Sequence, residues 1–509
     1  MKSVVSLLIF CVSIFSFSAY AQSETPEFIS SNKIDDYVEA AIDKWQIPGV
    51  AIGIVKDGKL VYAKGFGEQA LGSGKSVTSN TLFMIGSNSK AFTGTALAML
   101  EYQEKCDLND PVIKWYPRLK MQDPWLNDNL SLTDIVTHRI GMETFQGDFM
   151  YWDSDLMQHE IIEKFGQLKP MHAPRTTWGY CNAGYVLAGK CIQEISGMKW
   201  HSYLNNTFFN PLDMNHTYCY VSDLEHVSNF AKAHTIIDGK AKVIPYGNID
   251  NLAPAGAITS TIEDMSHWLI MQLDEGKYNG EQVIPVEVIQ KTRTPYSIVG
   301  QGSHPFNTSH FDLYSLGWAL QDYEGREMVS HTGGINGFVT SVTMVPDENL
   351  GILVFTNTDQ NYFFEAMKWE IADAYLSLPF QDYSNKYFTY FERNKLNEEK
   401  EIAEWQEKVE EKNEWPTDIS NFEGTYVHEV YGTVECSKKG KALELRFQHH
   451  PNLRAKLEYM EEDKFLCTYS DILYGIKTFP FVIEGEKVKS FTLSVADFLE
   501  HTTYDFTKQ

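Results

Sequence analysis

The chain has 509 residues, of which 43% are apolar and 13% are aromatic. This length and composition predict two to four folded domains with large cores, and they exclude a disordered chain. The formal net charge of −25 argues against a nucleic acid or an anionic membrane as a partner, because like charges repel each other.

The first 21 residues have the pattern of a secretory signal peptide. Lys2 precedes an apolar stretch over residues 4–17, and Ala19-Tyr20-Ala21 matches the small-x-small pattern of a cleavage site. We predict cleavage after Ala21 and an exported protein, periplasmic or secreted. No later stretch has the roughly 18 apolar residues that a membrane helix needs, so we expect no membrane span.

Periodicity predicts the secondary structure of the next part of the chain. Residues 34–45 have helical spacing, and residues 50–55 and 60–62 flank Lys-Asp-Gly-Lys as a hairpin would. The further elements, in order, are helices over residues 91–102, 132–138 and 185–196 and strands over residues 316–320, 340–346 and 351–356.

The pattern changes near residue 382. Residues 382–415 are charge-rich and helical in spacing, which predicts a linker helix. Residues 416–509 show period-two alternation, which predicts a small β-barrel or sandwich. We therefore divide the mature chain into residues 22–381, the linker and this C-terminal β domain.

Six cysteines follow the signal peptide, and none has the spacing of metal ligands. We expect no metal and no cofactor. Buried thiols are the favoured interpretation of cysteines this sparse, with room for one disulfide. The pairing is left open, and Cys436 with Cys467 is the first pair to test.

Three short motifs carry the chemistry. In the first, Gly86 precedes Ser87, and Lys90 follows one helical turn later. A serine at a helix start has free N–H groups beside it that favour negative charge on an attacked carbonyl oxygen. A desolvated lysine on the same face has a lowered pKa and can accept the serine proton.

The second motif is Tyr180-Cys181-Asn182. Its phenol, held as a phenolate near a lysine ammonium, can relay protons, and its amide can hold a substrate carbonyl or the lysine. The third motif is His331-Thr332-Gly333-Gly334, which stands just before a predicted strand. Two glycines there allow a substrate backbone to come close, and a strand-edge N–H can complete an oxyanion hole. Taken singly, each of these motifs is weak.

In this order the three motifs resemble the serine β-lactamase and penicillin-binding family, in the branch of class C β-lactamases, D-aminopeptidases and esterases. Stretches such as "APAGAITSTIEDMSHWL" and "YSLGWAL" are also similar to it, and the resemblance covers roughly residues 30–378. It implies an α/β sandwich, with an antiparallel sheet flanked by helices and a helical lobe, followed here by the β domain.

The resemblance also implies residue roles. Ser87 is the nucleophile, and Lys90 and Tyr180 move its proton. The N–H groups of Ser87 and Gly334 hold the oxyanion, and Asn182 positions the acyl group. His331, Thr332 and Gly333 complete the substrate-binding set.

One position departs from the family pattern, because His331 stands where β-lactamases have lysine. A histidine is mostly neutral at pH 7, so recognition of a substrate carboxylate is in doubt. Aromatic residues precede the second motif, and they either line a pocket or pack the helical lobe. The candidate pocket residues are Phe149, Tyr151, Trp152 and Trp178.

These observations predict an exported serine hydrolase that acts on an ester, amide or peptide through an acyl-enzyme on Ser87. The alternatives are an acyltransferase with a small-molecule alcohol or amine acceptor, a β-lactamase or penicillin-binding protein, and a non-catalytic binding protein on the same fold. All motifs lie before Pro346, so we expect the β domain to be dispensable for the covalent step.

Overall fold

The structure is a computed structural model that describes residues 25–301, 304–307 and 309–509. The predicted signal peptide lies outside these residues. In the part of the chain that the structure describes, no helix combines the length and the apolar character needed to cross a bilayer.

The N-terminal region is built on an eight-stranded antiparallel sheet. Its order is β2-β1-β14-β13-β12-β11-β10-β9. The strands are β1 (Gly49–Lys56), β2 (Lys59–Gly67), β9 (Ser297–Gln301), β10 (Phe311–Tyr314), β11 (Ala319–Tyr323), β12 (Arg326–Ile335), β13 (Phe338–Val345) and β14 (Leu350–Thr356). The predicted hairpin over residues 50–62 is β1 and β2.

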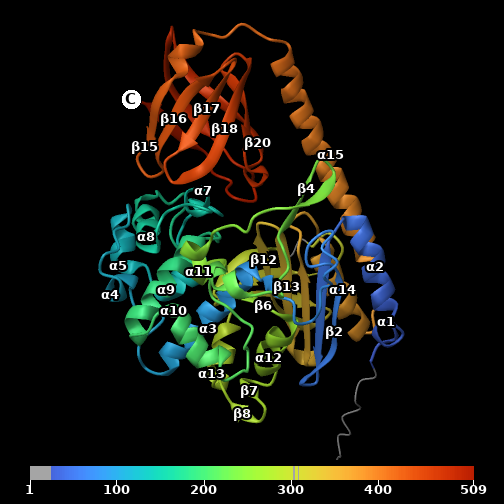
Figure 1. The fold of residues 1–509 in the computed structure, drawn as a ribbon. Helices are drawn as coiled ribbons and strands as arrows, with labels where there is room; N and C mark the ends of the chain where they lie inside the picture. The colour runs from blue at the N-terminus through green and yellow to red at the C-terminus, as the bar shows by residue number, and fades with distance from the viewer. Residues whose placement is uncertain (1–24, 302–303, 308) are drawn as a thin grey trace, which may run out of the picture.

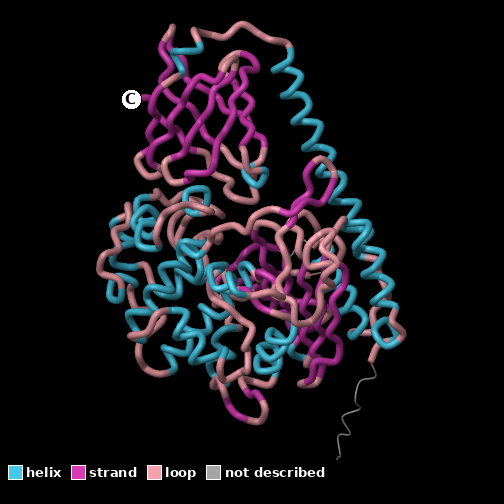
Figure 2. The backbone as a smooth tube through the Cα atoms, viewed as in Figure 1, coloured by secondary structure: helices cyan, strands magenta, loops and turns pink. Residues whose placement is uncertain are grey.

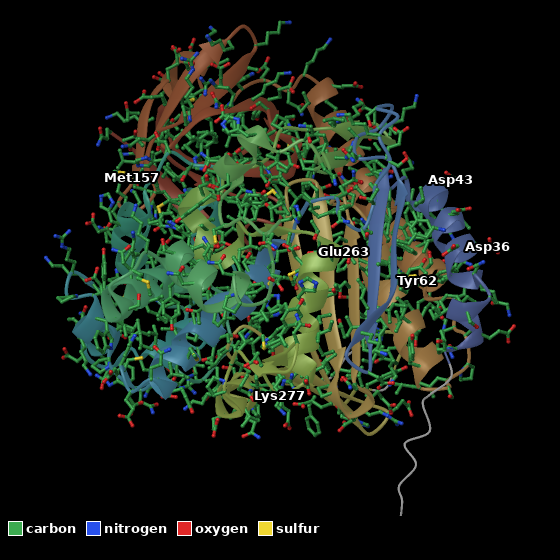
Figure 3. The ribbon with its side chains drawn as sticks, turned by 60° about the horizontal axis from the view of Figure 1, so that its bottom comes forward. Asp36, Asp43, Tyr62, Met157, Glu263 and Lys277 are labelled. Carbon is green, nitrogen blue, oxygen red and sulfur yellow. The ribbon has the colours of Figure 1, made fainter. Side chains whose placement is uncertain are left out.

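Helices cover both faces of this sheet, as Figure 1 shows. Along β1, Ala51 and Val55 join one core cluster with α12 (Ile262–Leu273), whereas Val50, Ile52 and Ile54 join a second cluster with α2 (Lys33–Trp45) and α14 (Phe363–Tyr375). Successive side chains of a strand point to opposite faces, so β1 is buried on both. Asp36 and Asp43 point away from the sheet on the outer side of α2 (Figure 3).

A helical lobe lies beside the sheet (Figure 2). Its helices are α3 (Ser89–Tyr102), α4 (Val112–Trp115), α5 (Pro124–Asn129), α6 (Leu132–Val136), α7 (Asp148–Tyr151), α8 (Gln158–Gln167), α9 (Asn182–Ser196), α10 (Trp200–Leu204), α11 (Ala253–Gly256) and α13 (Val286–Thr292). α9 ends at Gly197 in the left-handed region, as the sequence predicts. Short pieces complete this part: α1 (Glu27–Ser30), β3 (Phe83–Met84), β4 (His234–Ile237), β5 (Lys240–Val243), β6 (Thr259–Ser260), β7 (Lys277–Tyr278) and β8 (Glu281–Gln282).

The C-terminal part is a closed antiparallel barrel, not a sandwich. Its strands pair in chain order, and β15 closes on β22. They are β15 (Gly424–His428), β16 (Gly432–Lys439), β17 (Ala442–Phe447), β18 (His450–Glu461), β19 (Lys464–Tyr469), β20 (Ile476–Glu484), β21 (Lys487–Leu493) and β22 (Tyr504–Lys508). Sheet, helices and barrel together confirm the predicted fold class.

The long helix α15 (Tyr383–Glu410) runs from the N-terminal region to the barrel (Figure 1). Its start packs on α2, where the rings of Trp45 and Phe388 lie 4.9 Å apart. Its end reaches the barrel, where Lys408 Nζ lies 3.4 Å from a carboxylate oxygen of Glu461. The helix therefore contacts α2 at its start and the barrel at its end.

The barrel also packs directly on the helical lobe. Phe149 of α7 is 3% exposed, and its ring stacks on His450 at a centroid distance of 5.0 Å. The carbonyl of Trp152 accepts hydrogen bonds from His450 Nε2 and from the Tyr474 hydroxyl, at 3.1 and 3.2 Å. The loop between β21 and β22, residues 494–503, reaches the same contact, and we name it the barrel arm.

One predicted strand begins later in the structure than expected. The strand expected over residues 316–320 is β11, which starts at Ala319, because Gly317 has a φ of +83° and makes a turn before it. The cysteines agree with the favoured interpretation of buried thiols. All six described ones, including Cys436 and Cys467, are free, and all except Cys106 are buried.

Candidate active site

Ser87 lies in a 3₁₀ turn, η1 (Gly86–Asn88), directly before α3. Gly86 has a φ of +54°, which favours glycine. The turn packs so closely on β12 that a Cβ added to Gly333 would lie 1.9 Å from the carbonyl oxygen of Ile85. Serine is thus presented at a helix start, against a glycine of the central sheet.

Lys90 stands one turn along α3, and its side chain is fully buried. Its Nζ lies 3.1 Å from Ser87 Oγ, 2.7 Å from Asn182 Oδ1 and 2.8 Å from the carbonyl oxygen of Ala255. Burial lowers the pKa of Lys90 to about 7, although the buried Asp148 opposes the shift.

The three hydrogen-bond partners of Lys90 Nζ define what the neutral amine does. A neutral amine has two hydrogens and one lone pair. The Asn182 amide oxygen and the Ala255 carbonyl are pure acceptors, so they take the two hydrogens. The lone pair then faces the Ser87 hydroxyl, which is the arrangement of a general base beside its nucleophile.

Tyr180 lies over this pair. Lys90 Nζ is 4.6 Å from the centroid of its ring. The Tyr180 hydroxyl is buried and has no hydrogen-bond partner among the described residues, although Ser87 faces it. Burial, with Tyr314 close by, raises the pKa of Tyr180 well above its usual range. The phenolate considered from the sequence is therefore corrected to a neutral phenol, because desolvation penalises its charged form.

His331 is 6% exposed, and both of its ring nitrogens are engaged. Nδ1 lies 2.6 Å from the carbonyl oxygen of Thr332, so it carries the proton, and Nε2 accepts from the Tyr314 hydroxyl at 2.9 Å. Burial, with the Lys90 charge as a second cause, lowers the pKa of His331 to about 3. The imidazole is therefore neutral and supplies no cation.

The glycines of the third motif lie inside β12 and not in a turn before a strand. Gly333 and Gly334 pair with Thr340 and Val339 of β13. On its other side, β12 pairs with β11 only as far as Ser330, opposite Ala319. From residue 331 onwards, this edge of β12 is therefore not paired with β11. Gly334 and Ser87 line one narrow recess of about 10 Å³, which is about the space of one water molecule.

A larger cavity of about 310 Å³ opens beside His331. Its aromatic walls are Trp178, Tyr180, Tyr314 and Trp369, and Asp312 and Lys368 add charge. Of the four aromatic residues expected at a pocket, Trp178 lines this cavity and Trp152 lines the recess. Phe149 packs into the barrel and Tyr151 is buried beside Gly147, because α7 turns both side chains away from Ser87.

The barrel arm reaches the rim of the recess. A Cβ added to Gly334 would lie 3.2 Å from the ring of Phe498. That ring also meets Trp152 edge-on, at a centroid distance of 6.0 Å. The rim of the site is thus formed by residues of both parts of the chain.

Several contacts at the site were not predicted from the sequence. Ala255 lies in the "APAGA" stretch that resembles the family, and this was a usable signal. Asp148 accepts a hydrogen bond from Asn182 Nδ2 at 2.6 Å, and His138 Nδ1 accepts from the backbone N–H of Cys181 at 3.0 Å. No spacing marks these two residues, because only the fold brings them to the second motif.

The family model described as Beta-lactamase matches residues 34–376. The unguisins hydrolase ungD of Aspergillus violaceofuscus (strain CBS 115571) is 25% identical over 470 residues, which cover 85% of this chain and 82% of that protein. Protein flp of Staphylococcus aureus (strain N315) is 27% identical over 340 residues, which cover 65% of this chain and 64% of that protein.

Solved structures share the fold. The octameric penicillin-binding protein homologue from Pyrococcus abyssi superposes with a TM-score of 0.59 at 21% identity, covering 94% of this chain and 100% of that one. SurE superposes with a TM-score of 0.56 at 17% identity, covering 95% and 100%. The family match spans most of the chain and includes all three motifs, and the chain belongs to the Beta-lactamase family.

Proposed function

We propose that this protein is an exported serine hydrolase that cleaves an amide, peptide or ester bond through an acyl-enzyme on Ser87. The observation that carries the proposal is the buried Lys90 amine, 3.1 Å from the Ser87 hydroxyl. With its pKa lowered to about 7, about half of this amine is neutral at pH 7 and ready to accept a proton.

The reaction has two halves. Ser87 Oγ attacks the carbonyl carbon while Lys90 takes the serine proton, and the N–H groups of Ser87 and Gly334 receive the oxyanion in the recess that both residues line. The neutral Tyr180 phenol gives a proton to the leaving amine or alcohol, and the acyl group stays on Ser87. The Lys90 ammonium then passes its proton to the Tyr180 phenolate, which leaves Lys90 neutral again. Lys90 deprotonates a water molecule that attacks the acyl carbon, and this proton moves from Lys90 to Ser87 Oγ as the acid leaves.

The cavity supports an aromatic or extended substrate. Its walls at Trp178 and Tyr314 suit an apolar group, and the unpaired edge of β12 can hydrogen-bond an extended amide backbone. The relative named unguisins hydrolase supports hydrolysis over transfer.

The neutral His331 disfavours the β-lactamase alternative, because no cation stands at that position to bind a substrate carboxylate. The acyltransferase alternative needs the recess to admit an alcohol or amine larger than water. Product analysis in the presence of small alcohols and amines separates hydrolysis from transfer.

The test is covalent labelling. Mass spectrometry of the intact protein after reaction with a fluorophosphonate should show one added group on Ser87. The folded Ser87→Ala variant should show none, and its turnover should fall about a thousandfold or more. Retention of a tenth of the wild-type rate would sink the nucleophile assignment. The intact mass of the protein purified from its natural host should also show a chain that begins at Gln22, as export with cleavage after Ala21 requires.

A further inference from the structure

A single carboxylate of the barrel arm is buried at the start of α7. Glu500 is 2% exposed, and its carboxylate oxygens accept the backbone N–H groups of Gly147 at 2.7 Å and Phe149 at 3.0 Å. Gly147 is the N-cap residue of α7 and Phe149 lies in its first turn, where the N–H groups have no partner within the helix. The hydroxyl of Tyr431 donates to Glu500 at 2.9 Å, and the hydroxyls of Thr502 and Tyr504 also donate to it.

Asp148, which lies between Gly147 and Phe149 in the chain, is connected to Lys90 by hydrogen bonds through Asn182. Asp148 accepts from Asn182 Nδ2 at 2.6 Å, and Asn182 Oδ1 accepts from Lys90 Nζ at 2.7 Å. Asp148, Asn182 and Lys90 are each at most 6% exposed, so little water competes for these bonds. Glu500 is thus connected to Lys90 through α7 and two consecutive side-chain hydrogen bonds.

The charges of this connection are coupled as well. Burial raises the pKa of Asp148 well above its usual range, and the charge of Glu500 raises it further. An ionised Asp148 would favour the ammonium form of Lys90 and so raise the pKa of that amine.

The other titratable groups around this path change little near neutral pH. On the Lys90 side, burial lowers the pKa of both His138 and His331, so these rings are neutral, and burial raises the pKa of Cys181 to about 12. On the Glu500 side, burial raises the pKa of the phenols of Tyr151, Tyr431 and Tyr504, which stay protonated. Asp148 is therefore the carboxyl whose charge acts on Lys90, and Glu500 acts on Asp148. Burial raises the pKa of Glu500 itself, and the hydrogen bonds from Gly147, Thr502, Tyr504 and Phe149 oppose that shift by stabilising its carboxylate.

We infer that Glu500 is a positioning residue for the acylation step, through which the C-terminal barrel holds α7, Asp148 and Asn182 so that Lys90 acts as the base toward Ser87. The inference rests on the proposed function. It also revises the expectation that the barrel is dispensable for the covalent step.

The first test is Glu500→Gln in the full-length protein. The amide keeps the size but removes the charge, and its NH₂ group faces an N–H donor of α7. Asp148 then ionises more fully and the pKa of Lys90 rises, so the acidic limb of the acylation rate against pH should move up by about one pH unit. At pH 7 this change alone lowers the neutral fraction of Lys90, and hence the labelling rate at Ser87, about fivefold.

The matched control is Asp155→Asn, which also turns a carboxylate into an amide at the contact between barrel and helical lobe. Asp155 lies 3.0 Å from His449 Nδ1 and has no bond to α7. Its rate and pH profile should match the wild type. Equal effects of the two variants would show that Glu500 only holds the interface together, and an unchanged Glu500→Gln profile would overturn the inference.

Two further variants keep the test decisive. In an Asp148→Asn background, Glu500→Gln should shift the acidic limb little, because the intermediate carboxyl is gone. An equal shift in both backgrounds would contradict the path through Asp148.

Glu500→Asp serves if Glu500→Gln does not fold. It keeps the charge but is too short to reach both amides, so the labelling rate should fall about tenfold while the limb stays in place. A rate within about twofold of the wild type would overturn the inference.

A readout without catalysis separates this inference from the proposed function. In protein labelled with ¹³Cε-lysine, the Lys90 signal is assigned by its loss in Lys90→Arg. Its NMR titration midpoint should move up in Glu500→Gln and stay in Asp155→Asn. A wild type that never labels at Ser87 refutes the proposed function, whereas a midpoint that does not move in Glu500→Gln refutes the role of Glu500.

Discussion

At the scale of one residue, the burial of Lys90 lowers the stability of the folded protein. An exposed lysine has a pKa of about 10.4, and burial lowers the pKa of this one to about 7. Between these values the unfolded chain binds a proton that the folded chain does not, so stability rises with pH there. The penalty, of order 4 kcal/mol, is fully present below pH 7 and fades as pH rises toward 10.4. The fold tolerates this cost where the chemistry needs a neutral amine.

The same pKa predicts the pH dependence of acylation. The labelling rate at Ser87 should rise from acidic to neutral pH with a midpoint near 7, because only the neutral amine accepts the serine proton. His331, whose pKa is lowered to about 3, should contribute no limb near pH 6.5. Rate constants measured from pH 5 to 9 check this, with Lys90→Ala as the control that loses the limb. A flat wild-type profile would contradict the assignment of Lys90 as the base.

Tyr180 should affect one class of substrate more than another. Burial raises the pKa of its phenol, which favours the protonated form. In the proposed mechanism this phenol is the acid that assists the leaving group. Tyr180→Phe should therefore lower turnover of an amide about a hundredfold or more, since an amine needs that proton to leave. It should change fluorophosphonate labelling little, because fluoride leaves without it. Lys90→Ala should lower both rates. Equal losses for both reagents in Tyr180→Phe would mean that the phenol assists the attack itself.

At the scale of elements, the sequence predicts a helix or strand well when the residues that determine it are contiguous in the chain. α2, α3 and α9 start and end within about three residues of their predicted limits, because helical spacing and Gly197 are written in contiguous residues. The Gly333-Gly334 pair was placed before a strand, although it lies inside β12. Glycine is needed at position 333 because the Ile85 carbonyl packs against it. Ile85 lies 248 residues earlier in the chain, so no local pattern reveals this contact.

That approach makes Gly333 a test of β12. Gly333→Ala places a methyl group 1.9 Å from the Ile85 carbonyl, so the strand and the Ser87 turn must move apart. We expect a loss of about 3 kcal/mol in stability and slower labelling, since Ser87 and Gly334 no longer share one recess. Gly300→Ala in β9 is the control, because its Cβ meets no atom of the described residues within 4 Å. Denaturant unfolding measures both variants, and equal stabilities would contradict the close packing of η1 on β12.

At the scale of the whole molecule, the sequence indicated where the parts lie but not how they touch. The change from period 3.6 to period two marked the barrel, and the charged run marked α15. The contact between barrel and lobe has no such mark. Phe149 resembled a pocket residue because aromatic side chains serve both purposes. Glu500 stands in a loop without any motif, and its role depends on amides 353 and 351 residues earlier in the chain.

Removing the barrel tests this contact directly. A chain that ends after Leu396 keeps the first turns of α15, where Tyr383, Ser384 and Tyr387 are buried against the catalytic region. It loses Glu500 and exposes Phe149, which is 3% exposed in the full chain. We expect such a chain to aggregate or, where it stays soluble with native circular dichroism, to label at Ser87 at least about tenfold more slowly. The barrel and the end of α15, supplied as a separate polypeptide of residues 397–509, should restore part of the rate. A soluble truncated chain that labels as fast as the full protein would show that α7 keeps its position unaided, and the barrel would then need another explanation for its place beside the recess.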